Sequence, residues 1–163
     1  MVNKMEIKWE GEISYAHMLS DKDSKCFRLH GHNAKIEVII FGYPNDKGMI
    51  FDYNKISKII NEMDHKMIVQ QYNTSYMQKE RCKRYYPIVG NHKIYIDFSN
   101  DYMKCEPLYY INLTNESDIT AEILVEHLID KLKIYCGNNI KALEVKWWED
   151  SRSYASGIKK FIW

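Results

Sequence analysis

Residues 26–41 of this 163-residue chain read Cys-Phe-Arg-Leu-His-Gly-His-Asn-Ala-Lys-Ile-Glu-Val-Ile-Ile-Phe. The second half of this stretch alternates, because Ile36, Val38 and Ile40 fall on one face of an extended chain. The pattern predicts a β-strand from about His32 to Phe41 with one buried face. The first half carries side chains that can bind a metal or transfer protons, Cys26, His30 and His32.

Outward from this strand, hydrophobic periodicity predicts the other regular elements. Apolar residues alternate in three further segments and follow helical spacing in two, with Asp52 or Asn54 placed to cap the first helix and Gly137 to end the second in a left-handed conformation. The predicted strands are 5–15, 140–148 and 157–163, and the predicted helices cover about 55–67 and 120–135.

The segment 66–117 lacks strong periodicity, although 93–98 and 108–113 resemble short strands that would suit a hairpin. The order of elements is strand, strand, helix, insertion, helix, strand, strand. It predicts an α+β fold in a single domain, 1–163, with helices on one face of an antiparallel sheet and an insertion at about 66–117.

Composition excludes several classes of protein. Lysine and arginine total 23 against 22 acidic residues, so a nucleic-acid or anionic-membrane partner, which needs a basic surface, is not expected. The longest apolar run, 38–41, is far below the roughly 20 residues of a membrane helix. The N-terminus lacks the apolar core of a signal peptide, and the four scattered cysteines form no CxxC pair. We therefore expect a cytoplasmic protein with reduced thiols.

Three histidines predict a metal site. His30 and His32 stand at i and i+2 on a strand and project from the same face, while His17 ends the strand expected to pair with it. Three neutral imidazoles with an open fourth position are typical of catalytic zinc. A lone histidine is more often structural, so the prediction depends on the convergence of all three.

Cys26 leaves two interpretations open. As a fourth ligand it would close the coordination sphere and make the metal structural. As a free thiolate near a cation it would act as a base or nucleophile. The spacing of Cys26 from His30 does not separate the two.

Two acidic positions complete the candidates. Asp64 next to His65 is compatible with a proton relay. The simpler interpretation is that His65 is stabilised by the dipole at the C-terminal end of a helix. Glu149, after Trp147 and Trp148, suits a flat heterocycle with N–H donors, or is an ordinary acid where a strand ends.

Taken together, these motifs resemble the 6-pyruvoyl-tetrahydropterin synthase superfamily. The resemblance covers about two-thirds of the chain, and its CxxxHGH spacing is similar to the 6-carboxytetrahydropterin synthase branch. The motifs are Ile13-Ser-Tyr-Ala-His17, Cys26-Phe-Arg-Leu-His30-Gly-His32-Asn33, Gly48-Met-Ile-Phe-Asp52, Met63-Asp64-His65, Thr120-Ala-Glu122 and Glu149.

The resemblance implies a tunnelling fold, with a four-stranded antiparallel sheet, two helices on one face and the order ββααββ. It also implies a homohexamer, a dimer of trimers, with active sites at subunit interfaces. The implied substrate is 7,8-dihydroneopterin triphosphate, converted to 6-carboxy-5,6,7,8-tetrahydropterin, acetaldehyde and triphosphate in 7-deazaguanine biosynthesis, which leads to queuosine or archaeosine.

The resemblance also implies roles for individual residues. His17, His30 and His32 would hold zinc, and Cys26 would be the base. In addition, Asp64 and His65 would relay protons, and Glu149 would anchor the pterin ring.

Three departures from the family pattern stand out: the long segment 66–117, Ile119 in place of a usual proline, and Asp150 in place of a common threonine. Two alternatives follow. The first is a pyruvoyl-forming or other pterin-modifying enzyme of the same fold. The second is a non-catalytic, zinc-stabilised binding module in which Cys26 closes the metal site.

Overall fold

A computed structural model describes most of the chain. The described residues are 3–17, 19, 21, 23–28, 30–70, 84–85, 88–89, 92–93, 96–97, 108–111, 113 and 118–162. The regular elements are β1 (Met5–His17), a 3-10 helix (Lys25–Phe27), β2 (His30–Gly42), α1 (Tyr53–Asn61), β3 (Lys66–Gln70), β4 (Arg84–Tyr85), β5 (Ile88–Val89), β6 (His92–Lys93), β7 (Ile96–Asp97), β8 (Leu108–Ile111), α2 (Ala121–Lys133), β9 (Ile140–Trp148) and β10 (Tyr154–Lys160).

The chain divides into two compact units. The first unit comprises the residues up to Ser14, His32–Asp64 and Ala121 onwards, and the second comprises Tyr15–Gly31 and His65–Thr120. Each is described by itself below.

In the first unit the strands follow the order β10-β9-β2-β1. β9 pairs antiparallel with both β10 and β2, and the register sets Ile36 opposite Trp147 and Val38 opposite Val145. These four side chains are buried, as the alternation along β2 predicted. The strands predicted at 5–15, 32–41 and 140–148 are confirmed, and the last predicted strand lies at Tyr154–Lys160 rather than 157–163.

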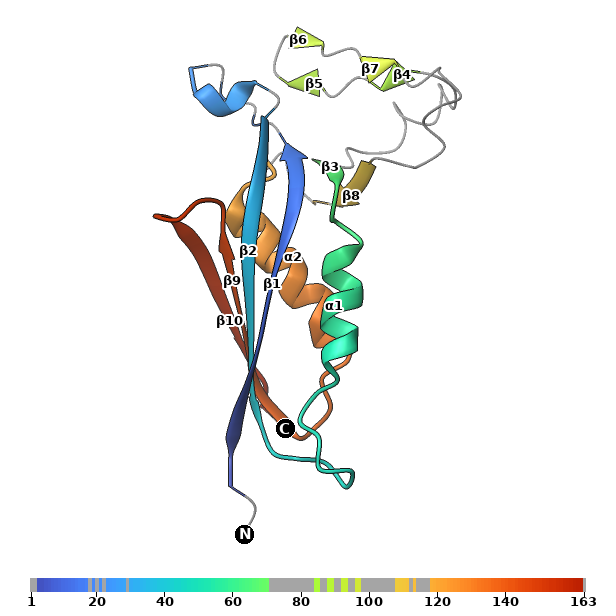
Figure 1. The fold of residues 1–163 in the computed structure, drawn as a ribbon, viewed down its shortest axis with the longest axis vertical. Helices are drawn as coiled ribbons and strands as arrows, with labels where there is room; N and C mark the ends of the chain where they lie inside the picture. Colours follow the sequence, from blue (N-terminus) through green and yellow to red (C-terminus); the bar gives the residue numbers. More distant parts are fainter. Residues whose placement is uncertain are drawn as a thin grey trace. The chain divides into compact units, whose positions relative to one another are not determined.

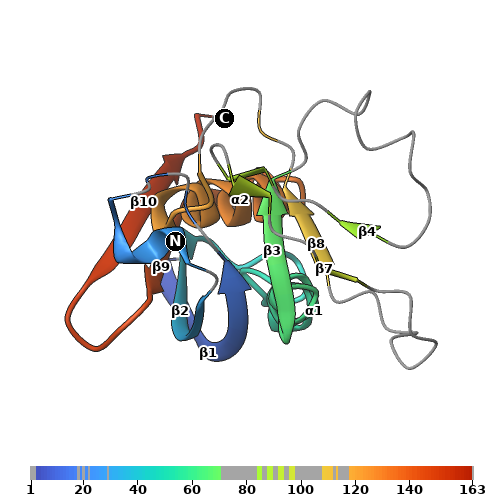
Figure 2. The same ribbon diagram turned by 90° about the horizontal axis from the view of Figure 1, so that it is seen from above.

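Both helices cover the same face of this sheet (Figure 1; Figure 2). α2 packs on β9 and β10, and α1 packs on α2. Their apolar faces close the core, which includes Ile56, Ile60, Leu124 and Leu128, each fully buried. The predicted α+β class, with two helices on one face of a sheet, is therefore confirmed.

The first helix begins as predicted but ends early. The Asp52 Oδ1 atom accepts the Asn54 N–H at 3.0 Å, which caps the helix. The helix ends at Asn61, a turn covers residues 62–65, and Met67 belongs to β3. The prediction that Asp64 and His65 end the helix is thus wrong, because the N–H groups of Met63 and Asp64 donate to carbonyls only three residues back, those of Ile60 and Asn61, so a tighter turn replaces the last α-helical turn. His65 then adopts a left-handed backbone with φ of 55°.

The second helix ends without the predicted left-handed glycine. Among the described glycines only Gly48 has a positive φ, of 77°, so the prediction for Gly137 is wrong. Tighter bonds complete the last turn instead: the N–H groups of Tyr135 and Cys136 donate to the carbonyls of Leu132 and Lys133, each at 3.0 Å.

In the second unit the pairing is parallel. Tyr15 and Ala16 at the end of β1 pair with Lys66 and Met67 of β3, and β3 pairs with β8 in the same sense. The sheet is therefore mixed and extends beyond the four antiparallel strands expected.

The predicted hairpin between 93–98 and 108–113 is wrong, because β8 pairs with β3 while β7 pairs with β4. The strand prediction itself holds at Leu108–Ile111. Residues 94, 95 and 98 of the other predicted strand, and much of the predicted insertion 66–117, lie outside the described residues.

In the part of the chain that the structure describes, no helix has both the length and the apolar character that crossing a membrane requires.

Burial of the His127 imidazole in α2, reinforced by the nearby Lys131 ammonium, lowers its pKa from 6.5 to about 4, against an opposing effect of Asp130. Between these values the unfolded chain binds a proton that the folded chain does not, so stability falls as the pH falls. We expect His127→Gln to reduce the loss of unfolding free energy between pH 7 and pH 4 by about 2–3 kcal/mol. Urea denaturation with chelator present measures this difference, and an unchanged pH dependence in the variant would contradict it.

Candidate metal centre and active site

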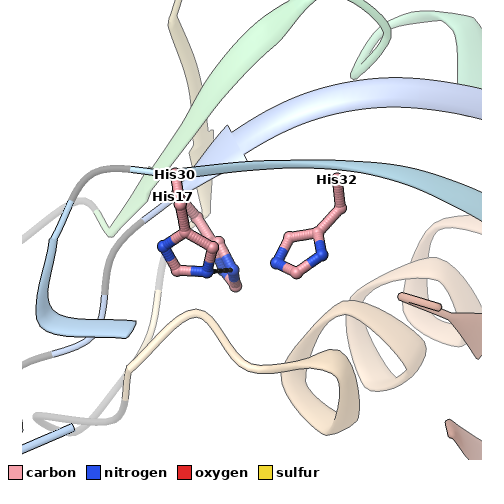
Figure 3. Close-up of side chains that lie close together, drawn as sticks. All are labelled: His17, His30 and His32. Atoms are coloured by element: carbon pink, nitrogen blue, oxygen red, sulfur yellow. Dashed lines mark hydrogen bonds between the residues drawn. The ribbon is translucent and has the colours of Figure 1, made fainter. Parts of the chain in front are cut away.

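The ends of two strands place three histidines together. His17 is the last residue of β1, and His30 and His32 open β2. Strand alternation puts both β2 histidines on the face that carries the buried Ala34 and Ile36. One nitrogen from each imidazole lies within 4.8 Å of the others. Figure 3 shows the three rings on the same side of β2.

Backbone carbonyls orient two of these rings. The His17 Nδ1 atom lies 2.7 Å from the Ile119 carbonyl oxygen, and the His30 Nδ1 atom lies 2.7 Å from that of Arg28. A carbonyl oxygen only accepts, so each Nδ1 carries the hydrogen and donates. In the neutral ring the lone pair is then on Nε2, the usual state of a metal-bound histidine.

The two Nε2 atoms face each other at 3.1 Å, with His17 only 2% exposed. Two unprotonated nitrogens at this separation repel unless a proton or a cation lies between them. Two ligand nitrogens at 2.0–2.1 Å from a tetrahedral zinc are roughly 3.3 Å apart. The donor set and its geometry therefore fit a metal ion, and the metal site predicted from spacing has a structural basis in this cluster.

Cys26 is not a member of the cluster. Among the residues that the structure describes, the group of side chains that could hold a metal ion consists of the three histidines. Cys26 lies in the 3-10 helix, half-buried and free, where its N–H donates to Ser24 Oγ at 3.1 Å. Its carbonyl accepts the Leu19 N–H at 2.9 Å. This geometry favours the open, three-histidine site over the closed one.

Asp64 is tied to strand β1. Its Oδ1 atom accepts the Ser14 N–H at 2.9 Å, and Ser14 Oγ donates to Asn33 Oδ1 at 2.8 Å. The neighbouring His65 is exposed and holds the left-handed conformation described above. Strained backbone of this kind at a non-glycine residue is often found at functional sites. The role of Ser14 in holding Asp64 was missed by the sequence prediction, because it depends on a backbone donor.

Glu149 directly follows β9 and is half-buried. The register pairs Trp148, the last residue of β9, with Lys35 of β2. Trp148 stacks on Tyr154 with ring centroids 4.2 Å apart. Glu149 therefore follows directly on a strand that pairs with β2, the strand that carries His30 and His32.

Comparisons with known proteins give a consistent picture. A profile of the family described as 6-pyruvoyl tetrahydropterin synthase matches residues 6–158. A protein of Pyrococcus abyssi is 34% identical over 93% of this chain and 88% of its own length, and one of Pyrococcus horikoshii is 37% identical with the same coverage. Both carry the provisional name 6-carboxy-5,6,7,8-tetrahydropterin synthase.

The fold is also found among solved structures. A catalytic-residue mutant of Plasmodium vivax 6-pyruvoyltetrahydropterin synthase superposes with a TM-score of 0.65 and 16% sequence identity. The match covers 98% of this chain and 99% of that one. At this identity the likeness concerns the fold alone.

The histidine cluster makes a direct prediction about metal content. We expect the purified protein to bind one zinc per chain, and His17→Gln, His30→Gln or His32→Gln to lose it, because two imidazoles leave the coordination sphere incomplete. His127→Gln is the matched control and should keep the metal. Metal analysis by mass spectrometry after dialysis measures both, and full zinc retention in the His17 and His30 variants would contradict the assignment.

Proposed function

Because this chain belongs to the 6-pyruvoyl tetrahydropterin synthase family, and so is an enzyme that acts on a pterin, we propose that it is a zinc-dependent 6-carboxytetrahydropterin synthase. The proposed reaction consumes 7,8-dihydroneopterin triphosphate and water. It releases 6-carboxy-5,6,7,8-tetrahydropterin, acetaldehyde and triphosphate, as a step of 7-deazaguanine biosynthesis. The observation that carries the proposal is the three-histidine cluster with two Nε2 atoms turned toward each other.

In this proposal His17, His30 and His32 hold the zinc. A bound zinc acts as a Lewis acid toward the hydroxyl groups of the substrate side chain and makes their neighbouring protons easier to remove. The carbonyl partners of His17 and His30 support this role, because they keep each ring in the tautomer and direction that a metal requires.

Cys26 is the proposed base that removes a proton from the substrate side chain. Its position is set locally by the Ser24 cap and by the Leu19 hydrogen bond, and it is free of disulfide bonding. Because Cys26 lies outside the cluster of three histidines, its thiol remains available for proton transfer rather than for metal coordination.

Asp64 and His65 are the proposed relay that returns protons during loss of triphosphate and acetaldehyde. The Ser14 N–H holds one oxygen of Asp64, which fixes the direction of the carboxylate. Glu149 is proposed to accept hydrogen bonds from the ring N–H groups of the pterin, which a carboxylate can do with both oxygens at once.

The proposal includes a homohexamer with active sites where subunits meet. β10 is the last strand in the order of the described sheet, and Tyr154 and Ile158 on it are 51% and 54% exposed. An edge strand with exposed apolar side chains such as these is suited to contact with a second copy. We also place the enzyme in the cytoplasm, where thiols such as Cys26 stay reduced.

Product analysis tests the reaction. We expect purified, zinc-loaded protein to release acetaldehyde and triphosphate from 7,8-dihydroneopterin triphosphate and to leave a pterin with a one-carbon carboxyl group at C6. Mass spectrometry of the pterin and derivatisation of the aldehyde measure the products. A pterin that keeps its whole carbon side chain would instead show the pyruvoyl-forming reaction, and no turnover with zinc bound would favour a binding module.

If Cys26 is the base, its removal should reduce turnover without reducing metal binding. We expect Cys26→Ala to lower kcat by about 10²–10⁴-fold, the range for loss of a general base, with zinc content unchanged. The control is Cys136→Ala, because burial raises the pKa of the Cys136 thiol to about 11 and keeps it protonated. Loss of zinc from the Cys26 variant would make Cys26 a ligand and overturn its role as base.

A further inference from the structure

A tight turn lies directly before α2 and is centred on Ile119. The Thr120 N–H donates to the Asp118 carbonyl at 3.0 Å, so a single residue is enclosed between donor and acceptor, as in a γ-turn. The Ile119 side chain is 3% exposed, which anchors the turn in the interior. With both the turn and the side chain fixed, the Ile119 carbonyl has one direction available.

That carbonyl points at a proposed metal ligand. It accepts the Nδ1–H of His17 at 2.7 Å, a short bond between groups that are 102 residues apart in sequence. Around the rest of the ring, Tyr15 meets it edge-on with centroids 5.2 Å apart, and His30 faces its Nε2 atom.

The second oriented ligand differs in this respect. His30 takes its carbonyl partner from Arg28, only two residues earlier in the chain, so this hydrogen bond is local. His17 depends on a contact formed only when the 118–120 turn closes onto the end of β1. The two ligands therefore differ in what holds them, and His17 is the one that tertiary structure must orient.

We propose that Ile119 is a positioning residue of the metal centre, which acts through its backbone carbonyl to fix the tautomer and direction of His17. This inference rests on the metal centre of the proposed function, but on neither its substrate nor its product. The side chain identity matters because a β-branched, buried residue restricts the backbone of the turn. Glycine at the same position would keep the carbonyl group, but the flexible backbone would no longer fix the direction in which it points.

Zinc affinity of the purified, metal-free chain tests the proposal. Competition with a chromophoric chelator gives the dissociation constant for wild type, Ile119→Gly and the matched control Ile119→Val. We expect the glycine variant to bind zinc about 10–100-fold more weakly, the usual effect of losing an outer partner of a ligand, and the valine variant to bind as wild type does. Equal affinity in the glycine variant and wild type would overturn the proposal.

Two further measurements separate positioning from a general loss of structure. In the metal-free proteins, nitrogen-15 NMR should show His17 with its hydrogen on Nδ1 in wild type and Ile119→Val, and a mixture of tautomers in Ile119→Gly. An unchanged His17 tautomer in a glycine variant with weakened zinc binding would show a general structural effect and overturn the proposal. Thermal unfolding of the metal-free variants checks that each is folded.

Nitrogen-15 NMR of the wild-type histidines gives an independent answer, even if Ile119→Gly fails to fold. The proposal expects His17 to carry its hydrogen on Nδ1 in the metal-free protein, and the other tautomer would overturn it. None of these readouts uses turnover. A chain that releases no acetaldehyde would therefore refute the proposed reaction and leave the positioning role to be decided by affinity and tautomer alone.

Discussion

The site depends on one constraint, the fixed direction of two imidazole rings. Carbonyl oxygens lie 2.7 Å from the Nδ1 atoms of His17 and His30 and accept their hydrogens, so the lone pairs of the two Nε2 atoms face each other across 3.1 Å. Such an arrangement is stable only with positive charge between the nitrogens, because lone pairs at this distance repel. A metal ion supplies that charge and gains ligands that need no reorientation, which lowers the entropic cost of binding.

The alternation of side chains along β2 places core residues and proposed metal ligands on the same face of the strand. Its buried residues Ala34, Ile36 and Val38 share a face with His30 and His32, and its register with β9 is fixed by buried pairs such as Ile36 and Trp147. A slip of one residue would turn the whole apolar face to the other side of the sheet, together with both histidines. Burial of the apolar residues therefore holds the ligands in place, and the sheet is a rigid support for chemistry.

Strong periodicity marks the parts of the fold that could be predicted. β1, β2 and β9 alternate over many residues, and Asp52 is followed by a helical pattern, so their positions follow from local preference. β8 was predicted only as a short strand and β3 was not predicted, because their parallel pairing depends on distant partners. The early end of α1 depends on the tighter turn over residues 62–65, because helical spacing continues to Met67 and gives no sign of that turn.

The same division applies to the candidate site. The sequence by itself determined which side chains can hold a metal, because i and i+2 histidines on a strand must share a face. It also indicated Cys26, Asp64 and Glu149 as candidates, through their order and spacing. Only the tertiary structure decided that Cys26 lies outside the cluster, and that Ser14 and Ile119 orient Asp64 and His17. These partners act through a backbone N–H group, which every residue type except proline carries, and a backbone C=O group, which all residue types carry, so the sequence does not identify them.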